Sequence, residues 1–405
     1  MLIALAWKNV WRNKKRSLII ATAIALGLWG GLLSSGLMIG LTEAYVNSAI
    51  DRDLSHIQLH TSRFKEDKLL NDIIPSADSI AEHIRRIPGV KEATPRTIIM
   101  GIAASPVTSN AVKISGIIPE LERKITSIPR CITQGVPLDS ATRLPIFIGE
   151  ELAIKLELRL RSKLVLSFQG VDGTIIYGAF RVCGIYRSES SMFDMMNVFV
   201  RRDDLFSLLG SQPLSHEIAV RLITTETLDS TVSMLKASNP GLLVESWKDL
   251  APEIKLFNEM IIIEVNIWLG IVLFALLFGV TNTMLMSVLD RVREFGILSA
   301  IGMKRWRLFG LIIVETIILA STGGIVGMIL GGASVLYFGS AGIDLVWFAK
   351  GMTYFGMPTI LYPVLPLWLY LSLTVMLIVT AIIAAIYPGI KAVRLNPATA
   401  IRTIG

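Results

Sequence analysis

The sequence predicts an α-helical membrane protein with four transmembrane helices. It also predicts a large α/β or α+β extracytoplasmic domain of two lobes, inserted between the first and second helices. Of the 405 residues, 52% are hydrophobic and 18% are charged, whereas soluble domains carry about 25% charged residues. Long apolar segments flank a stretch of ordinary soluble composition. The basic residues cluster beside those segments, as they do on the cytoplasmic side of membrane proteins.

Composition also excludes several classes of protein. The high hydrophobic content excludes a disordered chain, a collagen-like repeat and a small disulfide scaffold. It argues against a nucleic-acid partner despite the net charge of +7. Two cysteines and four histidines are too few for a cysteine-rich framework or a dense metal site. The sequence has no Gly-Lys pair, so it has no Walker A loop, and it lacks the serine-elbow and His-Glu-x-x-His motifs.

Four apolar segments are long enough to cross the roughly 30 Å hydrocarbon core, which takes about 20 residues. They cover residues 17–41, 260–289, 308–338 and 364–388. The second contains only Glu264 as a charged residue, and the third contains only Glu315. A cleaved signal peptide does not explain the first segment, because an apolar signal region runs for only about 7–15 residues.

Lys and Arg residues near the spans predict the orientation. They lie before the first span, between the second and third, and after the fourth: Lys8, Arg12, Lys14, Lys15, Arg16, Arg291, Arg293, Lys304, Arg305, Arg307, Lys391, Arg394 and Arg402. Between the third and fourth spans there is only Lys350. Both termini and the segment 290–307 are therefore expected in the cytoplasm, and the large domain outside it.

The expected organisation follows from these boundaries. In chain order it is an amphipathic cytoplasmic helix (1–16), TM1 (17–41), an extracytoplasmic domain (42–259) with a β-rich sub-lobe at about 135–205, TM2 (260–289), a cytoplasmic segment (290–307), TM3 (308–338), an extracytoplasmic loop (339–363), TM4 (364–388) and a cytoplasmic tail (389–405). Trp7 and Trp11 stand four apart among basic residues in the first helix, a pattern typical of a helix lying at the membrane interface.

Patterning within the large domain alternates between strands and helices. Strands are expected at 56–60, 112–117, 146–148, 163–168, 180–185, 197–200 and 218–223, and helices at 76–87, 150–156, 203–209 and 228–237. His56 and His60 would share one face of a strand, but no third metal ligand is evident, so partly exposed strand residues are the better interpretation. Cys131 and Cys183 could form a disulfide or be two small buried side chains.

Glycines spaced four apart occur in two of the spans. Gly27, Gly31, Gly36 and Gly40 lie in the first, and Gly323, Gly327 and Gly331 in the third. Small residues at this spacing let helices approach closely in lipid. They fit a subunit interface and packing within the chain equally well. Glu315 is too costly to face lipid, and a structural partner among the cytoplasmic Arg and Lys residues is the preferred interpretation over a proton relay.

The stretch TNTMLMSVLDRVREFGILSAIGMKRWRLFGLIIVE at 281–315 is the most informative part of the chain. An apolar turn lies between charged groups and is too short to be a domain. It fits a ridge that docks into a groove on another protein. A simple tight loop with basic residues explains the pattern equally well.

This stretch resembles the coupling-helix region of the FtsX-like permease family, which includes MacB and the lipoprotein-releasing LolC/LolE subunits. AWKNVWRNKKRSLI near the start and YPGIKAVRLNPATAIR near the end resemble that family's terminal motifs. IAEHIRRIPGVKEATPR, AVKISGIIPE, PIFIGEELAIKL and VESWKDLAPEIK resemble the lipoprotein-release type most.

The resemblance implies two sets of functional residues. An ATPase would contact Arg291, Arg293, Glu294, Phe295, Gly296, Ile297, Leu298, Ala300, Gly302 and Met303, with Phe295, Ile297 and Leu298 as apolar knobs. A dimer seam with access for cargo would be formed by Gly27, Gly31, Gly36, Gly40, Ile263 and Ile267. Residues 186–197, with four apolar side chains, are a candidate exposed loop, although buried core methionines explain them equally well.

The resemblance also implies a function. The chain would be a non-catalytic permease subunit in a bacterial inner membrane, with its large domain in the periplasm. It would pass ATP-driven motion to that domain and extract lipoproteins for outer-membrane sorting. A MacB-type exporter of peptides or drugs, or a transmembrane activator of periplasmic hydrolases, are the alternatives. It would bind no cofactor itself, because a separate ATPase chain would hold ATP and Mg²⁺. The other expected partners are a second permease copy or paralogue, lipoprotein cargo, and a periplasmic chaperone or adaptor.

Overall fold

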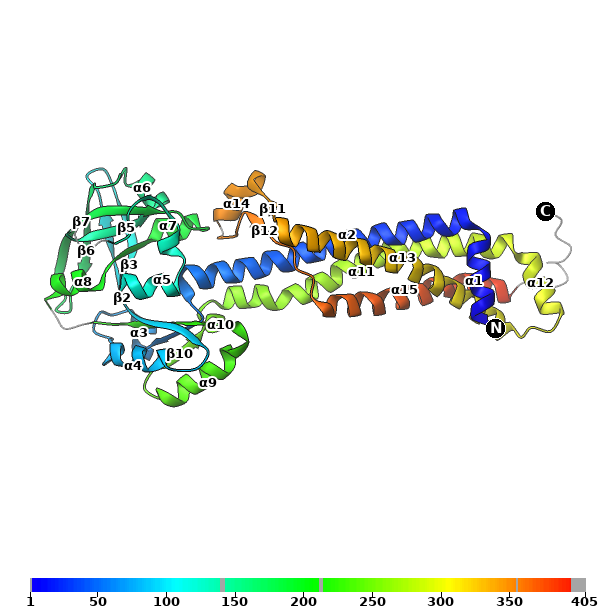
Figure 1. Cartoon of the computed structure of the whole chain (residues 1–405), viewed down its shortest axis with the longest axis horizontal. Helices are drawn as coiled ribbons and strands as arrows, with labels where there is room; N and C mark the ends of the chain where they lie inside the picture. Colours follow the sequence, from blue (N-terminus) through cyan, green and yellow to red (C-terminus); the bar gives the residue numbers. More distant parts are fainter. Residues whose placement is uncertain (1, 139–142, 211–213, 355, 395–405) are drawn as a thin grey trace. The chain divides into compact units, whose positions relative to one another are not determined.

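The computed structural model describes residues 2–138, 143–210, 214–354 and 356–394, and the chain divides into two compact units (Figure 1). The described residues of the helical unit lie within 2–42, 259–343 and 361–394. The mixed unit contains described residues of 43–258 and 344–360.

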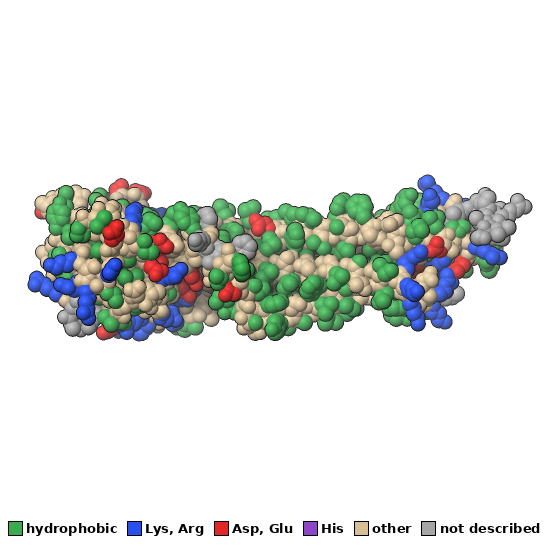
Figure 2. Space-filling view, turned by 90° about the horizontal axis from the view of Figure 1, so that it is seen from above, with side chains coloured by type: hydrophobic (Ala, Val, Ile, Leu, Met, Phe, Trp, Pro, Cys, Tyr) green, Lys and Arg blue, Asp and Glu red, His purple; other side chains and the backbone are tan. Residues whose placement is uncertain are grey.

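Four helices are long and apolar enough to cross a membrane. They are α2 (Lys14–Ala49), α11 (Pro252–Asp290), α13 (Arg305–Ala341) and α15 (Leu367–Val393). The first three contain the predicted spans, whereas α15 starts later than Val364 because Pro366 caps it in an extended conformation. The short helices α1 (Leu2–Arg12) and α12 (Val292–Ala300) complete the unit. Figure 2 shows apolar side chains along the long helices and charged ones gathered at one end of them.

Close packing between α2 and α13 depends on glycine. A Cβ atom on Gly323 would lie 2.6 Å from the carbonyl oxygen of Ala21, and one on Gly327 would lie 2.7 Å from that of Ala25. Real Cβ atoms do not approach so closely, so these positions require glycine. The core that the helices share is made of branched aliphatic residues, including Leu28, Leu32, Leu269, Leu273, Ile312, Leu369 and Leu373. Intrachain packing therefore accounts for the glycine series of the third span.

The mixed unit is built on a ten-stranded sheet with the order β10-β1-β9-β2-β3-β8-β5-β7-β4, in which β6 pairs with β2 and β7. The strands are β1 (Ile57–His60), β2 (Val90–Ala104), β3 (Ser109–Ile117), β4 (Ile132–Gly135), β5 (Pro145–Gly149), β6 (Lys163–Gln169), β7 (Ile175–Tyr186), β8 (Asn197–Arg201), β9 (Glu217–Leu222) and β10 (Leu243–Ser246). Most neighbours are antiparallel, but β3 with β8 and β5 with β7 are parallel. A separate pair joins β11 (Ile343–Asp344) and β12 (Ile360–Leu361).

Short helices accompany the sheet. They are α3 (Ser62–Asp67), α4 (Ala77–Arg85), α5 (Pro119–Ile125), α6 (Glu150–Lys155), α7 (Ser191–Met196), α8 (Arg202–Leu209), α9 (Leu228–Ser238), α10 (Trp247–Leu250) and α14 (Ala349–Tyr354). One apolar core joins α4 and α9 to β1, β9 and β10, and another joins α6 to β3, β5, β6 and β8. The long strand β2 contributes to both cores, through Ala93 and Ile99. The division into two lobes stays a prediction.

Each strand and helix predicted in this domain is present, within a few residues of the expected bounds. Two expectations need correction. The candidate exposed loop at 186–197 is partly helical, because it contains α7; Met192 and Met196 are exposed there, so they are not core methionines, whereas Phe193 is buried. His56 and His60 are buried rather than partly exposed, and each has a polar partner: His56 accepts a hydrogen bond from the Leu222 amide, and His60 lies 3.4 Å from Glu245.

Candidate functional site

A short helix interrupts the long helices between α11 and α13. Arg291 leaves the helical conformation, with φ −112° and ψ 18°, and α12 begins at the next residue. Gly302 ends the segment with φ +97°, a conformation that is costly for residues with a side chain. Lys304 then caps α13 in an extended conformation. The predicted cytoplasmic segment therefore folds into one compact helix bounded by two turns.

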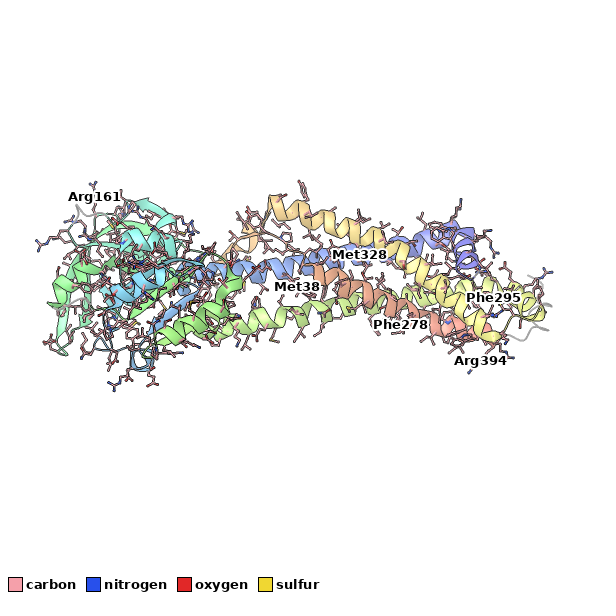
Figure 3. The ribbon with its side chains drawn as sticks, turned by 60° about the horizontal axis from the view of Figure 1, so that its bottom comes forward. Met38, Arg161, Phe278, Phe295, Met328 and Arg394 are labelled. Atoms are coloured by element: carbon pink, nitrogen blue, oxygen red, sulfur yellow. The ribbon has the colours of Figure 1, made fainter. Side chains whose placement is uncertain are left out.

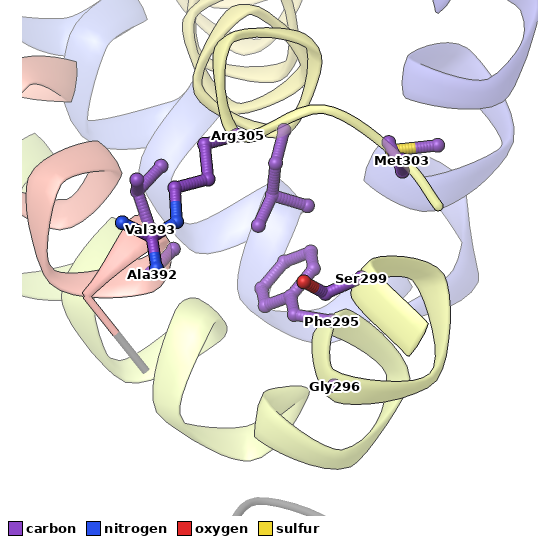
Figure 4. A pocket seen from close by; sticks show the side chains of 8 residues that line it. Phe295, Gly296, Ser299, Met303, Arg305, Ala392 and Val393 are labelled. Atoms are coloured by element: carbon purple, nitrogen blue, oxygen red, sulfur yellow. The ribbon is translucent and has the colours of Figure 1, made fainter. Parts of the chain in front are cut away.

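One face of α12 packs into its own chain. Phe295 is only 2% exposed and contributes to the core of the helical unit. Figure 4 shows its ring beside Ser299, and Figure 3 shows Phe295 and Arg394 at the same end of the helices. The cavity beside it has a volume of ≈10 Å³ and is lined by Phe295, Gly296, Ser299, Met303, Arg305, Leu308, Ala392 and Val393. This is about the space of one water molecule, so the aromatic ring fills the space between α12, α13 and α15.

The opposite face of α12 and the turn after it are exposed. Ile297 is 43% exposed and Ile301 is 80% exposed, so two branched apolar side chains face outward within one turn of each other. The residues of the predicted ATPase contact that share this exposure are Arg293, Ile297, Ala300 and Gly302. Leu298 and Met303 are half-buried against the core of the helical unit. Phe295 cannot be an outward knob in this arrangement, because it anchors α12 to its own chain, and Gly296 is buried beside it.

A buried ion pair joins α12 to α13. The Nη1 atom of Arg291 lies 3.2 Å from Oε2 of Glu315, and both residues are buried. Asn9 of α1 donates a hydrogen bond to the same carboxylate, at 2.6 Å. The Arg291 guanidinium also lies over the Phe295 ring, 5.2 Å from its centroid. The expectation that Glu315 has a basic partner from the cytoplasmic segments is therefore confirmed.

Three further ion pairs lie around this buried pair, and two of them extend it toward the surface. Glu294 accepts from Arg291 at 2.9 Å and from Arg12 of α1 at 2.5 Å. Arg16 of α2 pairs with Asp290 at the end of α11. Partial burial raises the pKa of Glu294, but the hydrogen bonds from Arg12 and Arg291 lower it more. The pKa therefore lies below its ordinary value, and the carboxylate stays charged to a lower pH than a free glutamate. The charges form a chain from a buried centre to exposed side chains.

A small polar cavity lies beside this ion-pair chain. Its walls come from α1, α2, α11 and α13 and include Asn9, Arg12, Arg16, Ser287, Arg291 and Glu315. Its volume of ≈30 Å³ has room for about two water molecules. The contacts beside it join α1 to α12 and α13, and α2 to α11, so the geometry suits the positioning of these helices.

The predicted seam residues fall into two groups. Gly27 and Gly31 face Leu276 and Leu269 of α11, and Gly36 and Gly40 lie against the chain at residues 362–364. A Cβ atom on Gly40 would lie 2.2 Å from the carbonyl oxygen of Tyr362. These glycines therefore pack within the chain. Ile263 and Ile267 are instead exposed along α11, together with Ile271, Phe274 and Phe278. The seam itself stays a prediction.

The histidines and cysteines considered in the sequence form no metal site or disulfide among the described residues. Among the described residues, no three histidine, cysteine or carboxylate side chains lie together in a way that could hold a metal. Cys131 and Cys183 are both free thiols. His56 accepts a hydrogen bond from the Leu222 amide, and burial lowers its pKa to about 4, so it is neutral at pH 7.

Sequence reasoning did not identify Asn9, Arg12, Arg16 and Asp290 as members of this site. Arg12 and Glu294 are 282 positions apart, so no local pattern connects them. The available signal was Glu315, because a carboxylate within a span requires polar partners. The part of the C-terminal motif beyond Arg394 lies outside the described residues.

Comparison with known proteins points to one family of domains. Residues 266–397, which include α12 and the buried pair of Arg291 with Glu315, match the family described as FtsX-like permease C-terminal. YvrN of Bacillus subtilis, named an uncharacterized ABC transporter permease, is 30% identical over 241 residues, or 55% of this chain and 54% of that protein. A permease of Methanocaldococcus jannaschii is 28% identical over 161 residues, or 38% of this chain and 40% of the relative. The macrolide export ATP-binding/permease protein MacB of Nitrobacter winogradskyi is 38% identical over 77 residues, 18% and 12% of the two chains.

The chain thus spans about half the length of YvrN and less of the other two relatives. Among solved structures, the periplasmic region of MacB from Actinobacillus actinomycetemcomitans aligns with a TM-score of 0.36 and 14% identity, covering 49% of this chain and 92% of that one. The extracellular domain of the transporter YknZ from Gram-positive bacteria aligns with a TM-score of 0.34 and 14% identity, covering 47% and 100%.

Proposed function

We infer from the FtsX-like permease C-terminal domain at residues 266–397 that this chain is a membrane permease subunit of an ABC transporter. It has four helices suited to crossing a membrane and a large mixed α/β unit. The permease would pass motion from an ATPase to that unit rather than carry out a reaction. ATP and Mg²⁺ would be bound by the ATPase, and this chain would bind no cofactor.

The observation that carries this proposal is the two-sided arrangement of α12. Its inner face is anchored by Phe295 and by the ion pair of Arg291 with Glu315. Its outer side presents Ile297 and Ile301 to a partner. An apolar ridge held on a rigid support is suited to helix-in-groove docking. A partner that pushes on the ridge would move α11, α13 and α15 together, since α12 is packed against all of these elements or continuous with them.

The proposed orientation places this ridge in the cytoplasm. Both termini and the segment 290–307 would lie inside, because their basic residues follow the positive-inside rule, and the mixed unit would lie outside the inner membrane. A second permease copy or paralogue would pack along α11. The exposed Ile263 and Ile267 would contribute to that seam, while the glycines of α2 would set the packing inside each subunit.

We propose lipoproteins anchored in the outer leaflet as the cargo. Extraction of an acyl chain from a membrane costs about 0.8 kcal/mol per CH₂ group, so it requires coupling to ATP. The segments IAEHIRRIPGVKEATPR and VESWKDLAPEIK, which resemble the lipoprotein-release type, support this cargo. A periplasmic chaperone would then receive the lipoprotein.

A second candidate is export of peptides or drugs through a periplasmic adaptor. Several relatives are named macrolide export proteins, which favours this alternative. Tagged purification from native membranes in mild detergent, followed by mass spectrometry, separates the two. Recovery of an ATPase with lipoproteins or a lipoprotein chaperone supports release, and an ATPase with an adaptor supports export. Absence of any ATPase after crosslinking would overturn the assignment to an ABC transporter. Recovery of a periplasmic hydrolase without exported cargo would indicate the third alternative, a transmembrane activator of periplasmic hydrolases.

The ridge itself can be tested by substitution. Ile297→Asp and Ile301→Asp should each weaken ATPase association by at least about tenfold, because burying a carboxylate in an apolar groove is costly. Ile223→Asp is the matched control, since Ile223 is also exposed (67%) but lies in the mixed unit. Equal ATPase recovery with all three variants would exclude the ridge as the contact. Glu294→Lys should also weaken association, but indirectly, through loss of the Arg12 and Arg291 contacts.

A further inference from the structure

Helix α1 has two faces of different character. Ala6 and Val10 are buried against the helical unit, and α1 packs on α13. On the other side, Ile3 is 70% exposed and Trp7 is 51% exposed. Trp11 follows one turn later, with its ring 5.9 Å from that of Trp7. Tryptophan is the residue typical of the membrane–water interface, where the ring is half apolar and half polar.

Basic residues surround this exposed aromatic face. Lys8 lies on α1, and Lys14 and Lys15 lie at the start of α2, where the chain turns into the span. All three are exposed. The acidic groups that contact α1 and the start of α2 are Glu315, Glu294 and Asp290, and they are already paired with Arg291, Arg12 and Arg16. The charge presented to solvent by this corner of the molecule is therefore positive.

The inward side chains of the same helix reach the support of α12. Asn9 donates to Glu315, and Arg12 pairs with Glu294 of α12. Lys8 and Asn9 are adjacent, as are Trp11 and Arg12. A displacement of α1 from the membrane surface would therefore break the contacts that orient α12.

We propose that α1 and the Lys14–Lys15 corner bind the headgroups of anionic lipids, and that this contact holds α12 in the orientation described above. Lipid composition then regulates coupling to the ATPase. The lipid contact stands independently, whereas its consequence for coupling rests on the proposed function. Positive charge combined with two interfacial tryptophans fits a lipid surface better than a protein groove, because each lysine near an anionic surface strengthens binding by about fivefold.

The test uses the full chain in lipid nanodiscs, either of phosphatidylcholine alone or with about 30% phosphatidylglycerol. Hydrogen exchange is followed in peptides covering residues 2–12 and 292–303. Anionic lipid should slow exchange in both peptides by at least about fivefold, the contribution of one lysine. The variant K8Q/K14Q/K15Q should lose this difference. The variant K91Q/K163Q/K236Q removes three exposed lysines of the mixed unit and should keep it. Free glycerol phosphate added to phosphatidylcholine discs should have no effect.

A second variant tests the link between the helices. Arg12→Gln should leave the slowing in residues 2–12 intact and remove most of it in residues 292–303. Equal exchange in both lipids would overturn the proposal, and so would an equal loss in the two lysine variants. Protection that depends on protein concentration instead of lipid charge would point to a second copy and would also overturn it. These readouts need no ATPase, so they stand or fall separately from the permease assignment.

Discussion

Each unit of the molecule contains a buried arginine paired with carboxylates, and the two clusters are built differently. In the mixed unit, Arg96 lies 2.6 Å from Glu122 and 2.7 Å from Glu217, and all three side chains are buried. It also donates to the carbonyl oxygen of Asp53 at 3.2 Å. In the helical unit, Arg291 is equally buried, but its network continues through Glu294 to Arg12, which is exposed.

The Arg96 cluster is therefore closed to solvent, whereas the Arg291 network is adjustable because it is open to solvent. The partners of Arg96 are enclosed by β2, β9 and α5, so no outside molecule can compete for them. The network of Arg291 reaches the surface, where a partner or a lipid can exchange with its outer members. Buried charges that are fully paired set a geometry. A network of ion pairs that reaches solvent can also change its geometry, because its outer members can exchange partners.

The largest expected effect comes from breaking the enclosed cluster. Arg96→Met would leave Glu122 and Glu217 buried without a countercharge, which costs about 3–5 kcal/mol of folding free energy. Thermal unfolding of the full chain in detergent, followed by circular dichroism, measures the loss. The triple variant R96M/E122L/E217L serves as the control and should recover most of the stability, because it removes the charges together. An unchanged midpoint in the single variant would contradict a structural role for the cluster.

The mixed unit should also show two opposed pH dependences. Burial raises the pKa of Asp194 from 3.8 to about 6, so its contribution to stability is full below pH 3.8 and lost as the pH rises through 6. Burial, with the charge of Arg221, lowers the pKa of His56 from 6.5 to about 4, so its contribution is full above pH 6.5 and lost as the pH falls through 4. Each pKa shift corresponds to a change of about 3 kcal/mol in the free energy of unfolding across its pH range.

The effects of Asp194 and His56 on the pH dependence of stability nearly cancel when both residues are present. Asp194→Asn should therefore make unfolding easier as the pH falls from 6.5 to 4, and His56→Asn should make it harder. Urea unfolding of the full chain at several pH values gives both slopes. If the two variants show slopes of the same sign, the opposed assignment is wrong.

Breaking the adjustable network should cost less. Glu315→Gln keeps the shape and the contact with Asn9 but removes the charge that pairs with Arg291. The loss of a charged hydrogen bond is worth about 1.5–3 kcal/mol. Limited proteolysis at residues 292–303 should become faster, while thermal unfolding of the mixed unit should not change. If cleavage in this segment is as slow as in the native chain, the ion pair does not hold α12.

The smallest expected effect comes from the packing of the helical unit, at the contact between α2 and α13. Gly327→Ala places a Cβ atom against the carbonyl oxygen of Ala25 and should cost about 1–3 kcal/mol by overpacking. Gly279→Ala on α11 has open space around it and should be neutral or slightly stabilising. Thermal inactivation of the detergent-solubilised chain compares them. Equal midpoints for both variants would show that the α2–α13 contact can relax.

The sequence predicted the parts of the fold that repeat a simple pattern. Long apolar runs predicted the spans, and alternating apolar residues predicted most strands of the mixed unit. Strand β2 was missed because Lys91, Glu92, Thr94, Pro95 and Arg96 lie within it, and these residues are typical of a polar loop. Their burial depends on partners in β9 and α5 that become neighbours only after folding.

The candidate site was predicted in position but not in detail. The pattern around residues 291–303 indicated a short docking segment, and α12 lies there. It could not show that Phe295 turns inward, because hydrophobicity alone does not say which partner covers a side chain. In the structure, that side chain packs in the core of the helical unit, with the Arg291 guanidinium over its ring.

The chain passes between its two units four times, near residues 42, 258, 343 and 360. The third and fourth crossings exist because residues 344–360 belong with the mixed unit, where Ser48 and Arg52 lie against Gly356. The first and second crossings lie inside single helices, α2 and α11, so the backbone hydrogen bonds of a helix continue through each of them.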